Sequence, residues 1–304
     1  MSRIHEALKK AATERSAQLG NKPASELAGL VAGGLVEAVI PDQTPREGRT
    51  ALLNLEEPGS QSFETLVGKC RRTEWKIDPR FSVFSDESAF PHGAEKFRTL
   101  RSRLHQIAAV RPLKRVLVAS SVPEEGKTFI ASNLAQSIIR QESKKVLLID
   151  GDLRASRLHL TLGTAATPGL ADYLRGEADE GQVIQVGSQD NLCFIPGGTG
   201  VSNPSELLQS ERMKALLDRL SPLFDWIVLD SPPAIAVHDA SILADLCDGV
   251  LFVVRAGATD FEIAQKAAGE FEDKNLLGVV LNRVDKSVSY GDYYYGYHSK
   301  QEAK

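Results

Sequence analysis

The stretch that most limits what this chain can fold into runs from residue 115 to 130 and reads RVLVASSVPEEGKTFI. Its first part, 116–119, is an apolar run that fits a buried strand, and the polar residues after it, with Pro123, cannot extend that strand. Gly126, Lys127 and Thr128 then open a helix whose apolar residues recur at spacings of three and four. A strand, a loop and a helix that starts with Gly-Lys-Thr form the setting that a phosphate-binding loop requires.

The physical basis of that expectation is the first turn of the helix. Its backbone N–H groups have no partners inside the helix and carry roughly half a positive charge, so they attract anions. Lys127 would add a full charge near the β- and γ-phosphates of a nucleotide, and the Thr128 hydroxyl would ligate Mg²⁺. The match to G-x-x-x-x-G-K-[ST] lacks the first glycine, which is Ser121 here. The simpler alternative is a glycine-capped turn before an ordinary helix.

The rest of the chain alternates between strand-like and helix-like stretches. Short apolar runs occur at 146–149, 192–195, 227–229, 250–254 and 279–281. Helical patterns occur at 94–106, 128–140, 169–174, 204–220, 239–246 and 261–271. The apolar runs are mostly unbroken, which is typical of strands covered on both faces. Their alternation with helices predicts an α/β fold of the P-loop NTPase kind, with a mostly parallel sheet flanked by helices on both faces.

Composition excludes several classes of protein. The net charge of −4 provides no basic field for nucleic acid, so no nucleic-acid partner is expected. Cys70, Cys193 and Cys247 are odd in number and far apart, which suits a reducing cytoplasm better than a disulfide framework or a zinc site. The first residues lack the basic-then-apolar pattern of a signal peptide.

The sequence suggests four segments. Residues 1–20 carry the pattern of an amphipathic helix, which would either dock on a partner or stay solvated. Residues 21–80, interrupted by prolines, glycines and charges, read as a partly disordered linker or appendage. Residues 81–285 form the expected compact domain. Residues 286–304 are a tail that contains five of the six tyrosines, namely Tyr290, Tyr293, Tyr294, Tyr295 and Tyr297.

Two further apolar runs end in carboxylates. The first leads into Asp150 and Asp152, and the second leads into Asp230. In a parallel sheet these ends point to the same edge as the Gly-Lys-Thr loop, where ligands of such sheets bind. Three carboxylates at a nucleotide suit phosphoryl transfer, in which protein groups position Mg²⁺ and orient the nucleophile. An aspartate at a strand end is otherwise a turn former or a helix cap.

Taken together, the motifs resemble those of the bacterial tyrosine kinases of capsule and exopolysaccharide synthesis. Three segments look like the nucleotide motifs of that family: SSVPEEGKT at 120–128, DGDLR at 150–154 and DSPP at 230–233. The helix with Glu95, Arg98 and Arg101 resembles its subunit-contact motif, although an exposed ion-pair stripe would explain that spacing as well. NPSELL at 203–208 and the tyrosine cluster are also similar to the family. The opening MSRIHEALKKA resembles cytoplasmic members without a fused membrane domain.

The resemblance implies a role for each matching residue. Lys127 and Thr128 would hold ATP phosphates and Mg²⁺, Asp150 would be the base for the tyrosine hydroxyl, and Asp152 and Asp230 would organise the metal. Arg154 would steady a phosphate or a neighbouring subunit. Asn282, at the end of the last strand, stands where related ATPases contact adenine, or simply ends that strand. The remaining nucleotide-binding candidates are the other loop positions, Ser121, Glu124, Glu125, Gly126 and Phe129.

The resemblance also implies a function and partners. The expected activity is transfer of the γ-phosphate of Mg-ATP to the tail tyrosines, in a homo-oligomer on the cytoplasmic side of the membrane. The expected partners are a membrane-embedded polysaccharide chain-length regulator that activates the kinase and a phosphotyrosine phosphatase.

One departure from the family keeps rival functions open. Many relatives have glycine where this chain has Glu124, whose side chain would cost energy at positive φ and repel triphosphate. This favours a nucleotide-binding scaffold of a membrane complex as one alternative. A positioning ATPase is the other, but such proteins carry a lysine where this chain has Val122.

Overall fold

The fold is built on one mostly parallel sheet, described here from a computed structural model that defines residues 62–87 and 90–284. In that part of the chain the sheet has eight strands in the order β1-β4-β5-β3-β6-β2-β7-β8, and only β4 and β5 pair antiparallel. The strands are β1 (Arg71–Arg72), β2 (Arg115–Ser120), β3 (Val146–Asp150), β4 (Gln185–Val186), β5 (Leu192–Ile195), β6 (Trp226–Asp230), β7 (Gly249–Arg255) and β8 (Leu276–Asn282).

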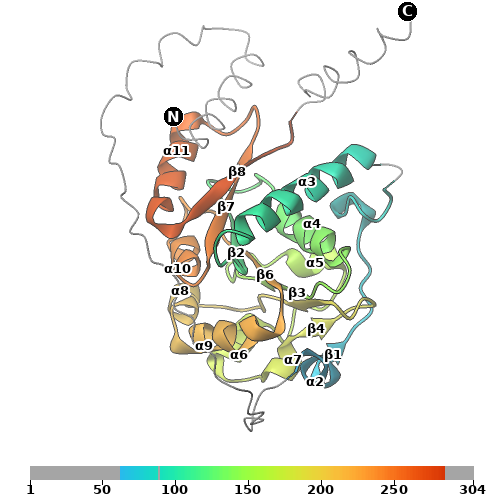
Figure 1. Ribbon diagram of the computed structural model, residues 1–304. Helices are drawn as coiled ribbons and strands as arrows, with labels where there is room; N and C mark the ends of the chain where they lie inside the picture. The colour runs from blue at the N-terminus through green and yellow to red at the C-terminus, as the bar shows by residue number, and fades with distance from the viewer. Residues whose placement is uncertain (1–61, 88–89, 285–304) are drawn as a thin grey trace, which may run out of the picture.

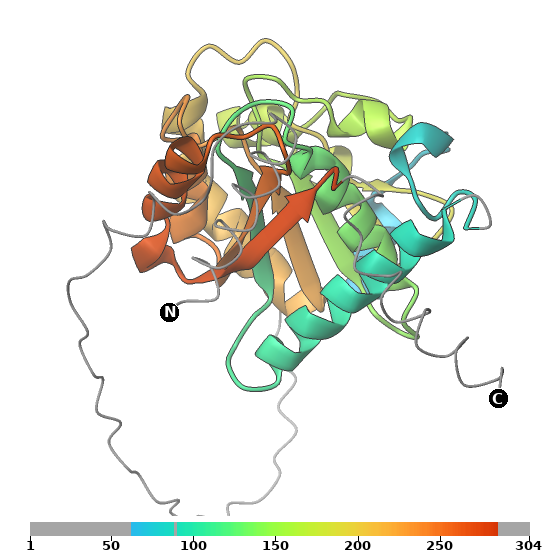
Figure 2. The same ribbon diagram turned by 90° about the horizontal axis from the view of Figure 1, so that it is seen from above.

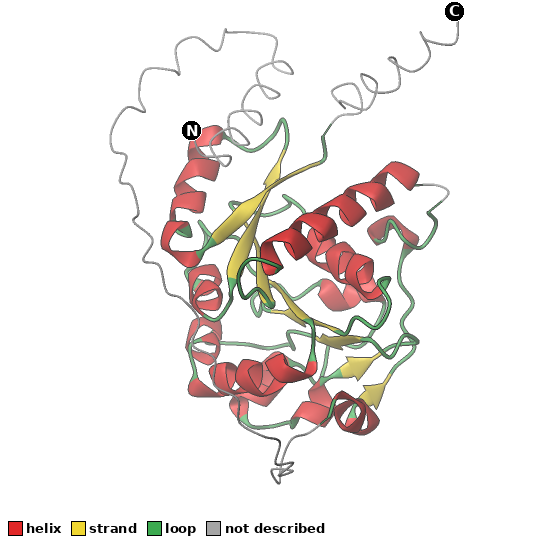
Figure 3. Cartoon of the chain, in the orientation of Figure 1, coloured by secondary structure: helices red, strands yellow, loops and turns green. Residues whose placement is uncertain are grey.

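Helices cover both faces of this sheet, as Figures 1 and 2 show. On one face lie α3 (Pro91–Ala108), α4 (Lys127–Ile139) and α5 (Leu158–Leu162). On the other lie α2 (Phe63–Lys69), α6 (Leu170–Arg175), α7 (Glu180–Val183), α8 (Pro204–Leu208), α9 (Glu211–Leu220), α10 (Asp239–Asp245) and α11 (Phe261–Gly269). Short 3₁₀ turns occur at Pro79–Phe81, Ser221–Leu223 and Glu272–Lys274. The result is the three-layer α/β architecture that the sequence predicts (Figure 3).

Strand β2 shows why the apolar runs are unbroken. Leu117 and Ala119 point into the core beneath α6 to α11, whereas Val116 and Val118 point into the core beneath α3 and α4. All four side chains are fully buried. Because successive side chains of a strand face opposite sides, a strand between two helical layers needs apolar residues at every position.

The structure differs from the sequence-based expectation mainly in what it adds. All six apolar runs form strands, but β1 and β4 contain two residues each and have no sequence signal. The helix expected over 204–220 is divided into α8 and α9, because Ser210 caps the start of α9 with its side chain. No helix in the described part of the chain is both long and apolar enough to span a bilayer.

Part of the segment expected to be a linker, residues 62–80, packs against the sheet. Phe63 stacks edge-on against Phe224 at 5.3 Å between ring centroids, and Leu66 is 1% exposed. Strand β1 then pairs with β4 at the edge of the sheet. The apolar residues of α2 are too few to give a clear periodic pattern, so the sequence does not reveal them. The helix expected at 1–20 and the tail at 286–304 lie outside the described residues.

Candidate active site

The carboxyl ends of β2, β3 and β6 bring the three predicted motifs together. Asp150 and Asp230 are direct neighbours in the register of β3 and β6. Gly151 donates its N–H to the carbonyl of Asp230 at 2.9 Å, and Ala234 donates to the carbonyl of Ser120 at 2.8 Å. Since these backbone bonds join the loops that follow the three strands, the motifs form one rigid edge.

The loop between β2 and α4 contains two residues with left-handed backbone. Gly126 has φ 96°, and a Cβ there would lie 2.1 Å from Nδ2 of Asn282, so only glycine fits. Glu124 has φ 65°. A non-glycine residue in this region costs about 1–2 kcal/mol, so the loop holds strain at the position where the sequence departs from the family.

Glu125 fixes the shape of this loop from within. Glu125 is only 1% exposed. Its carboxylate accepts hydrogen bonds from Val122 N at 2.8 Å and from Thr259 Oγ1 at 2.6 Å. The Arg255 N–H donates to the same carboxylate at 3.3 Å. The carboxylate therefore ties the loop to the segment after β7. Arg255 and Thr259 belong to no recognisable motif, so the sequence alone gives no sign of their contacts with Glu125.

Three other expected nucleotide-binding residues use their side chains in a similar way. The Ser121 hydroxyl donates to Glu125 at 3.3 Å, and the Asn282 amide donates to the Glu125 carbonyl at 2.8 Å. The Phe129 ring packs against Phe97, 5.9 Å between centroids, in the core under α3. These side chains therefore shape the loop and its helix, and the loop backbone is left to face a ligand.

The groups that could take part in chemistry lie at the N-terminus of α4, where the loop ends. Lys127 Nζ is 3.6 Å from Asp152 Oδ2, and the two side chains are only 13% and 8% exposed. The Thr128 hydroxyl donates to Asp230 Oδ2 at 2.6 Å. An ammonium group, a hydroxyl and two carboxylates are thus gathered at the N-terminus of α4, which is itself an anion-binding position.

Asp150 and Asp230 are buried carboxyl groups with unusual protonation. Burial is the main cause that raises the pKa of Asp150 to about 6 and that of Asp230 to about 7; the charge of Asp152 also raises the pKa of Asp150, and the charge of Asp150 also raises that of Asp230. Asp150 accepts hydrogen bonds from Ser156 Oγ at 2.7 Å, from Leu158 N at 3.1 Å and from Asp152 N at 3.1 Å. Its Oδ2 therefore accepts two hydrogen bonds and its Oδ1 accepts one.

One oxygen of Asp230 has no partner within residues 62–87 and 90–284. This oxygen, Oδ1, is buried and accepts no hydrogen bond from them, although the other oxygen accepts from Thr128. An unpaired buried carboxylate oxygen is costly unless a ligand satisfies it. Mg²⁺ is commonly held by one or two protein oxygens together with nucleotide phosphates and water, and the Thr128 and Asp230 oxygens fit that pattern. The described residues contain no cluster of three or more His, Cys, Asp or Glu that would hold a metal unaided.

Arg154 points away from this group. Its Nε and Nη2 donate to the two oxygens of Asp239 at 2.7 and 3.1 Å, and Nη2 also donates to Ser205 Oγ at 2.9 Å. In this structure the Arg154 side chain is thus tied to α10 and α8, and its contact with a phosphate stays a prediction.

The helix expected to join subunits also has partners within the chain. Arg98 pairs with Glu87 at 2.5 Å and with Glu95 at 3.4 Å. Arg101 donates to the Ser137 carbonyl at 2.5 Å, in the last turn of α4. The exposed Glu95 and half-exposed Arg98 remain available to a neighbouring subunit. The five tail tyrosines lie outside the described residues.

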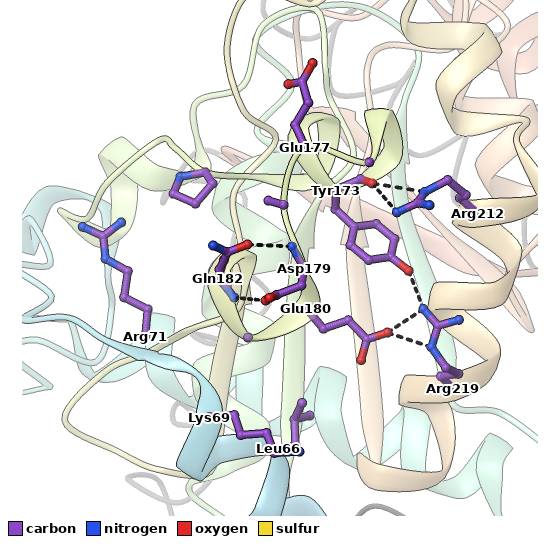
Figure 4. A pocket seen from close by; sticks show the side chains of 14 residues that line it. Leu66, Lys69, Arg71, Tyr173, Glu177, Asp179, Glu180, Gln182, Arg212 and Arg219 are labelled. Atoms are coloured by element: carbon purple, nitrogen blue, oxygen red, sulfur yellow. Dashed lines mark hydrogen bonds and ion pairs between the residues drawn. The ribbon is translucent and has the colours of Figure 1, made fainter.

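A separate hollow, open to solvent and with a volume of about 1060 Å³, lies between α2, α6, α7 and α9 (Figure 4). None of the phosphate-loop residues lines it. Arg212 and Arg219 converge on Tyr173 from one side: the first donates to its carbonyl at 3.0 Å, and the second donates to its hydroxyl. Arg219 also pairs with Glu180 at 2.5 Å. These charges hold α6, α7 and α9 together, and the hollow is not the site of the motif chemistry.

Comparison with known proteins places these features in context. Residues 124–262 match a family model described as an AAA domain. Over 207 residues the chain is 36% identical to the tyrosine-protein kinase YwqD of Bacillus subtilis, covering 67% of this chain and 86% of that protein. It is 37% identical over 195 residues to the tyrosine-protein kinase CpsD of Streptococcus agalactiae, covering 62% of this chain and 84% of the relative.

The fold is also similar to that of a solved tyrosine kinase domain. The solved kinase domain of the Escherichia coli tyrosine kinase ETK superposes with a TM-score of 0.59 at 32% sequence identity. The match covers 65% of this chain and 78% of that one.

Proposed function

Because the chain belongs to the bacterial tyrosine-protein kinases and is therefore a tyrosine-protein kinase, we propose that it takes Mg-ATP as donor and its own tail tyrosines as acceptors. The observation that carries this proposal is the unpaired Asp230 Oδ1 beside the Thr128 hydroxyl, at the start of α4. Two oxygens in that position suit a divalent cation that bridges nucleotide phosphates.

The roles of the residues follow from their places. The loop backbone and the first turn of α4 hold the phosphates, because their N–H groups have no partners within the helix. Lys127 lies 3.6 Å from Asp152 and would exchange that ion pair for the β- and γ-phosphate oxygens. Mg²⁺ held by Thr128 and Asp230, directly or through water, would neutralise charge that develops on the transferred phosphoryl group. Asp152 would orient this arrangement from the side of Lys127.

We assign Asp150 as the group that accepts the proton of the tyrosine hydroxyl. A raised pKa makes a carboxylate a stronger base, and a general base works best with a pKa close to the working pH. The Ser156 hydroxyl already donates to Asp150 Oδ2 at 2.7 Å, so a hydroxyl has a favourable approach to this oxygen. A tyrosine would take the place of Ser156. Asp150→Asn should therefore lower kcat strongly, whereas Ser156→Ala should not.

Reach and charge support the tail as acceptor. A fully extended stretch of the length of 285–297 would span about 40 Å at the usual rise per residue, which is enough to enter a neighbouring subunit. Each phosphotyrosine adds about −1.5 to −2 charges, so five would place roughly −8 to −10 on one tail. Such a tail would be repelled by the carboxylates of the site. Phosphorylation would thus loosen a homo-oligomer joined through Glu95, Arg98 and Arg101.

The wider role that we propose is control of capsule or exopolysaccharide synthesis and export. It rests on the resemblance of the motifs to that family. In this role the kinase acts at the cytoplasmic face of the membrane, is activated by a membrane-embedded chain-length regulator, and is reset by a phosphotyrosine phosphatase. Residues 1–20 are the proposed contact with the membrane partner. Unchanged membrane recruitment in cells after deletion of residues 2–20 would remove that contact.

The experiment that tests the activity is phosphotyrosine mapping. The purified full chain is incubated with Mg-ATP and analysed by mass spectrometry, with Lys127→Met as the folded, inactive control. Phosphate should appear on tyrosines between 290 and 297 in the wild type alone. An unmodified tail, or equal modification of the Lys127→Met variant, would refute autophosphorylation by this site.

A further inference from the structure

A side-chain cluster beside the active site has no role in the chemistry described above. It consists of Arg154 in the loop after β3, Asp239 at the first position of α10 and Ser205 at the second position of α8. Ser205 Oγ donates to Asp239 Oδ1 at 2.6 Å, and Arg154 donates to both oxygens of Asp239. The cluster therefore joins three segments that are distant in the sequence. The NPSELL motif contributes Ser205 to it.

The cluster is anchored by a buried charge. The Asp239 side chain is fully buried, whereas that of Arg154 is 40% exposed. Arg154 is the cation paired with that carboxylate, in a two-pronged geometry that lysine cannot reproduce. Removing one partner of such a pair leaves the other charge without compensation, which is more disruptive than loss of a surface ion pair.

The loop that carries Arg154 also carries the reactive carboxylates. Asp152 stands two positions before it, and the Ala155 N–H donates to Asp152 Oδ1 at 3.0 Å. Within the same loop, Ser156 and Leu158 donate to Asp150. Anchoring Arg154 therefore fixes the segment that holds both Asp150 and Asp152 in their positions.

Asp239 is also connected to the phosphate loop, through the segment that precedes it. Asp239 follows the 231–238 segment, whose Ala234 and Ile235 donate backbone N–H groups to the carbonyls of Ser120 and Ser121 at 2.8 and 3.2 Å. The loops after β2, β3 and β6 are thus connected by side chains as well as by backbone.

We propose that Asp239, with Ser205, is a positioning residue for phosphoryl transfer: it holds Arg154, and through it residues 150–158, so that Asp152 faces Lys127 and Asp150 stays beside Asp230. In this role Arg154 does not bind nucleotide. The kinetic test of this inference rests on the proposed use of ATP as phosphoryl donor. The structural test does not, because it is made on the nucleotide-free protein.

The kinetic test uses Arg154→Gln, Asp239→Asn, the double variant and Ser205→Ala. Arg175→Gln is the matched control, because Arg175 also pairs with a carboxylate, Asp172, at 2.5 Å but lies away from the motifs. Each of the first two changes should lower kcat about 10- to 100-fold, the cost of a small misplacement of catalytic groups. The KM for ATP should stay within about twofold, because no nucleotide contact is lost.

The double variant separates a common role from two independent ones. If the pair acts as one unit, the double variant should be no slower than the slower single variant. Ser205→Ala should have a smaller effect of about two- to fivefold, since it removes one neutral donor. Multiplied effects in the double variant, unchanged kcat in Asp239→Asn, or a raised KM with unchanged kcat in Arg154→Gln would each overturn the proposal.

The structural test needs no substrate. Amide hydrogen exchange of the nucleotide-free full chain should be faster at 151–158 in Arg154→Gln and Asp239→Asn than in the wild type and in Arg175→Gln. Exchange in the first turns of α4 should not change. Unaltered protection of 151–158 would overturn the positioning role. If the wild type shows no ATP-dependent transfer, the proposed donor is wrong, and this exchange experiment alone decides the inference.

Discussion

Replacing Asp230 with asparagine should stabilise the nucleotide-free protein at alkaline pH while it removes activity. Asp230 is fully buried beside Asp150, and its Oδ1 has no partner. Burial raises its pKa from 3.8 to about 7, so the folded protein retains a proton that the unfolded chain releases. The free energy of unfolding therefore falls as the pH rises from about 4 to about 7, and it stays low above this range.

The size of the effect follows from the shift. A difference of about three pKa units corresponds to at most about 4 kcal/mol, at about 1.4 kcal/mol per unit. Asparagine carries no charge, and its amide can donate toward Asp150, but burying the amide without ideal partners costs about 1–3 kcal/mol. A net gain of about 2 kcal/mol in a domain of this size raises the melting temperature by about 4–8 °C.

The assay is thermal unfolding of wild type and Asp230→Asn, without nucleotide or metal, at about pH 4.5 and about pH 8. We expect the variant to melt higher at the alkaline pH and slightly lower at the acidic one, where the wild-type carboxyl is protonated and the cost of the buried amide is no longer offset. Asp190→Asn is the control: Asp190 is exposed, and Arg72 lowers its pKa, so this variant should gain no stability at alkaline pH. A variant that melts below the wild type at pH 8, or an equal difference at both pH values, would refute the reasoning.

Three other changes test the same edge of the sheet. Glu124→Gly relieves the left-handed backbone at φ 65° and removes a charge near the phosphates, so it should tighten nucleotide binding measured by calorimetry; weaker binding would contradict the repulsion argument. Glu125→Ala removes a buried acceptor of the Val122 and Thr259 donors and should cost about 3 kcal/mol in denaturant unfolding, against little change for the exposed Glu206→Ala. Lys127→Met should abolish phosphotransfer in a protein that still folds, with a lower melting temperature because Asp152 loses its cation; retained transfer would exclude Lys127 from the site.

Local patterns in the sequence are enough to predict the central fold and the convergence of the three motifs at one edge of the sheet. The apolar runs at 116–119, 146–149 and 227–229 became β2, β3 and β6 because every residue of a doubly covered strand must be apolar. Their carboxyl ends meet at one edge, and the prediction that three carboxylates lie near the Gly-Lys-Thr loop follows from that alone. The peripheral β1 and β4 are too short for a pattern, and only pairing with each other and with β5 defines them.

Side-chain partners were beyond prediction because they depend on contacts across long sequence separations. Glu125 and Thr259 are 134 positions apart, and Arg154 and Asp239 are 85 apart. Motif position alone suggested that Glu125, Asn282 and Arg154 face a nucleotide. Their side chains also form hydrogen bonds that tie the loops together, and sequence spacing does not contain these contacts.

The most direct test of the whole account is a structure of the full chain with Mg²⁺ and a non-hydrolysable ATP analogue. The terminal phosphates should accept from the backbone N–H groups of residues 125–128 and from Lys127, and the metal should contact the Thr128 hydroxyl with Asp230 directly or through one water. An analogue bound elsewhere, or a metal held without Thr128 and Asp230, would contradict the account.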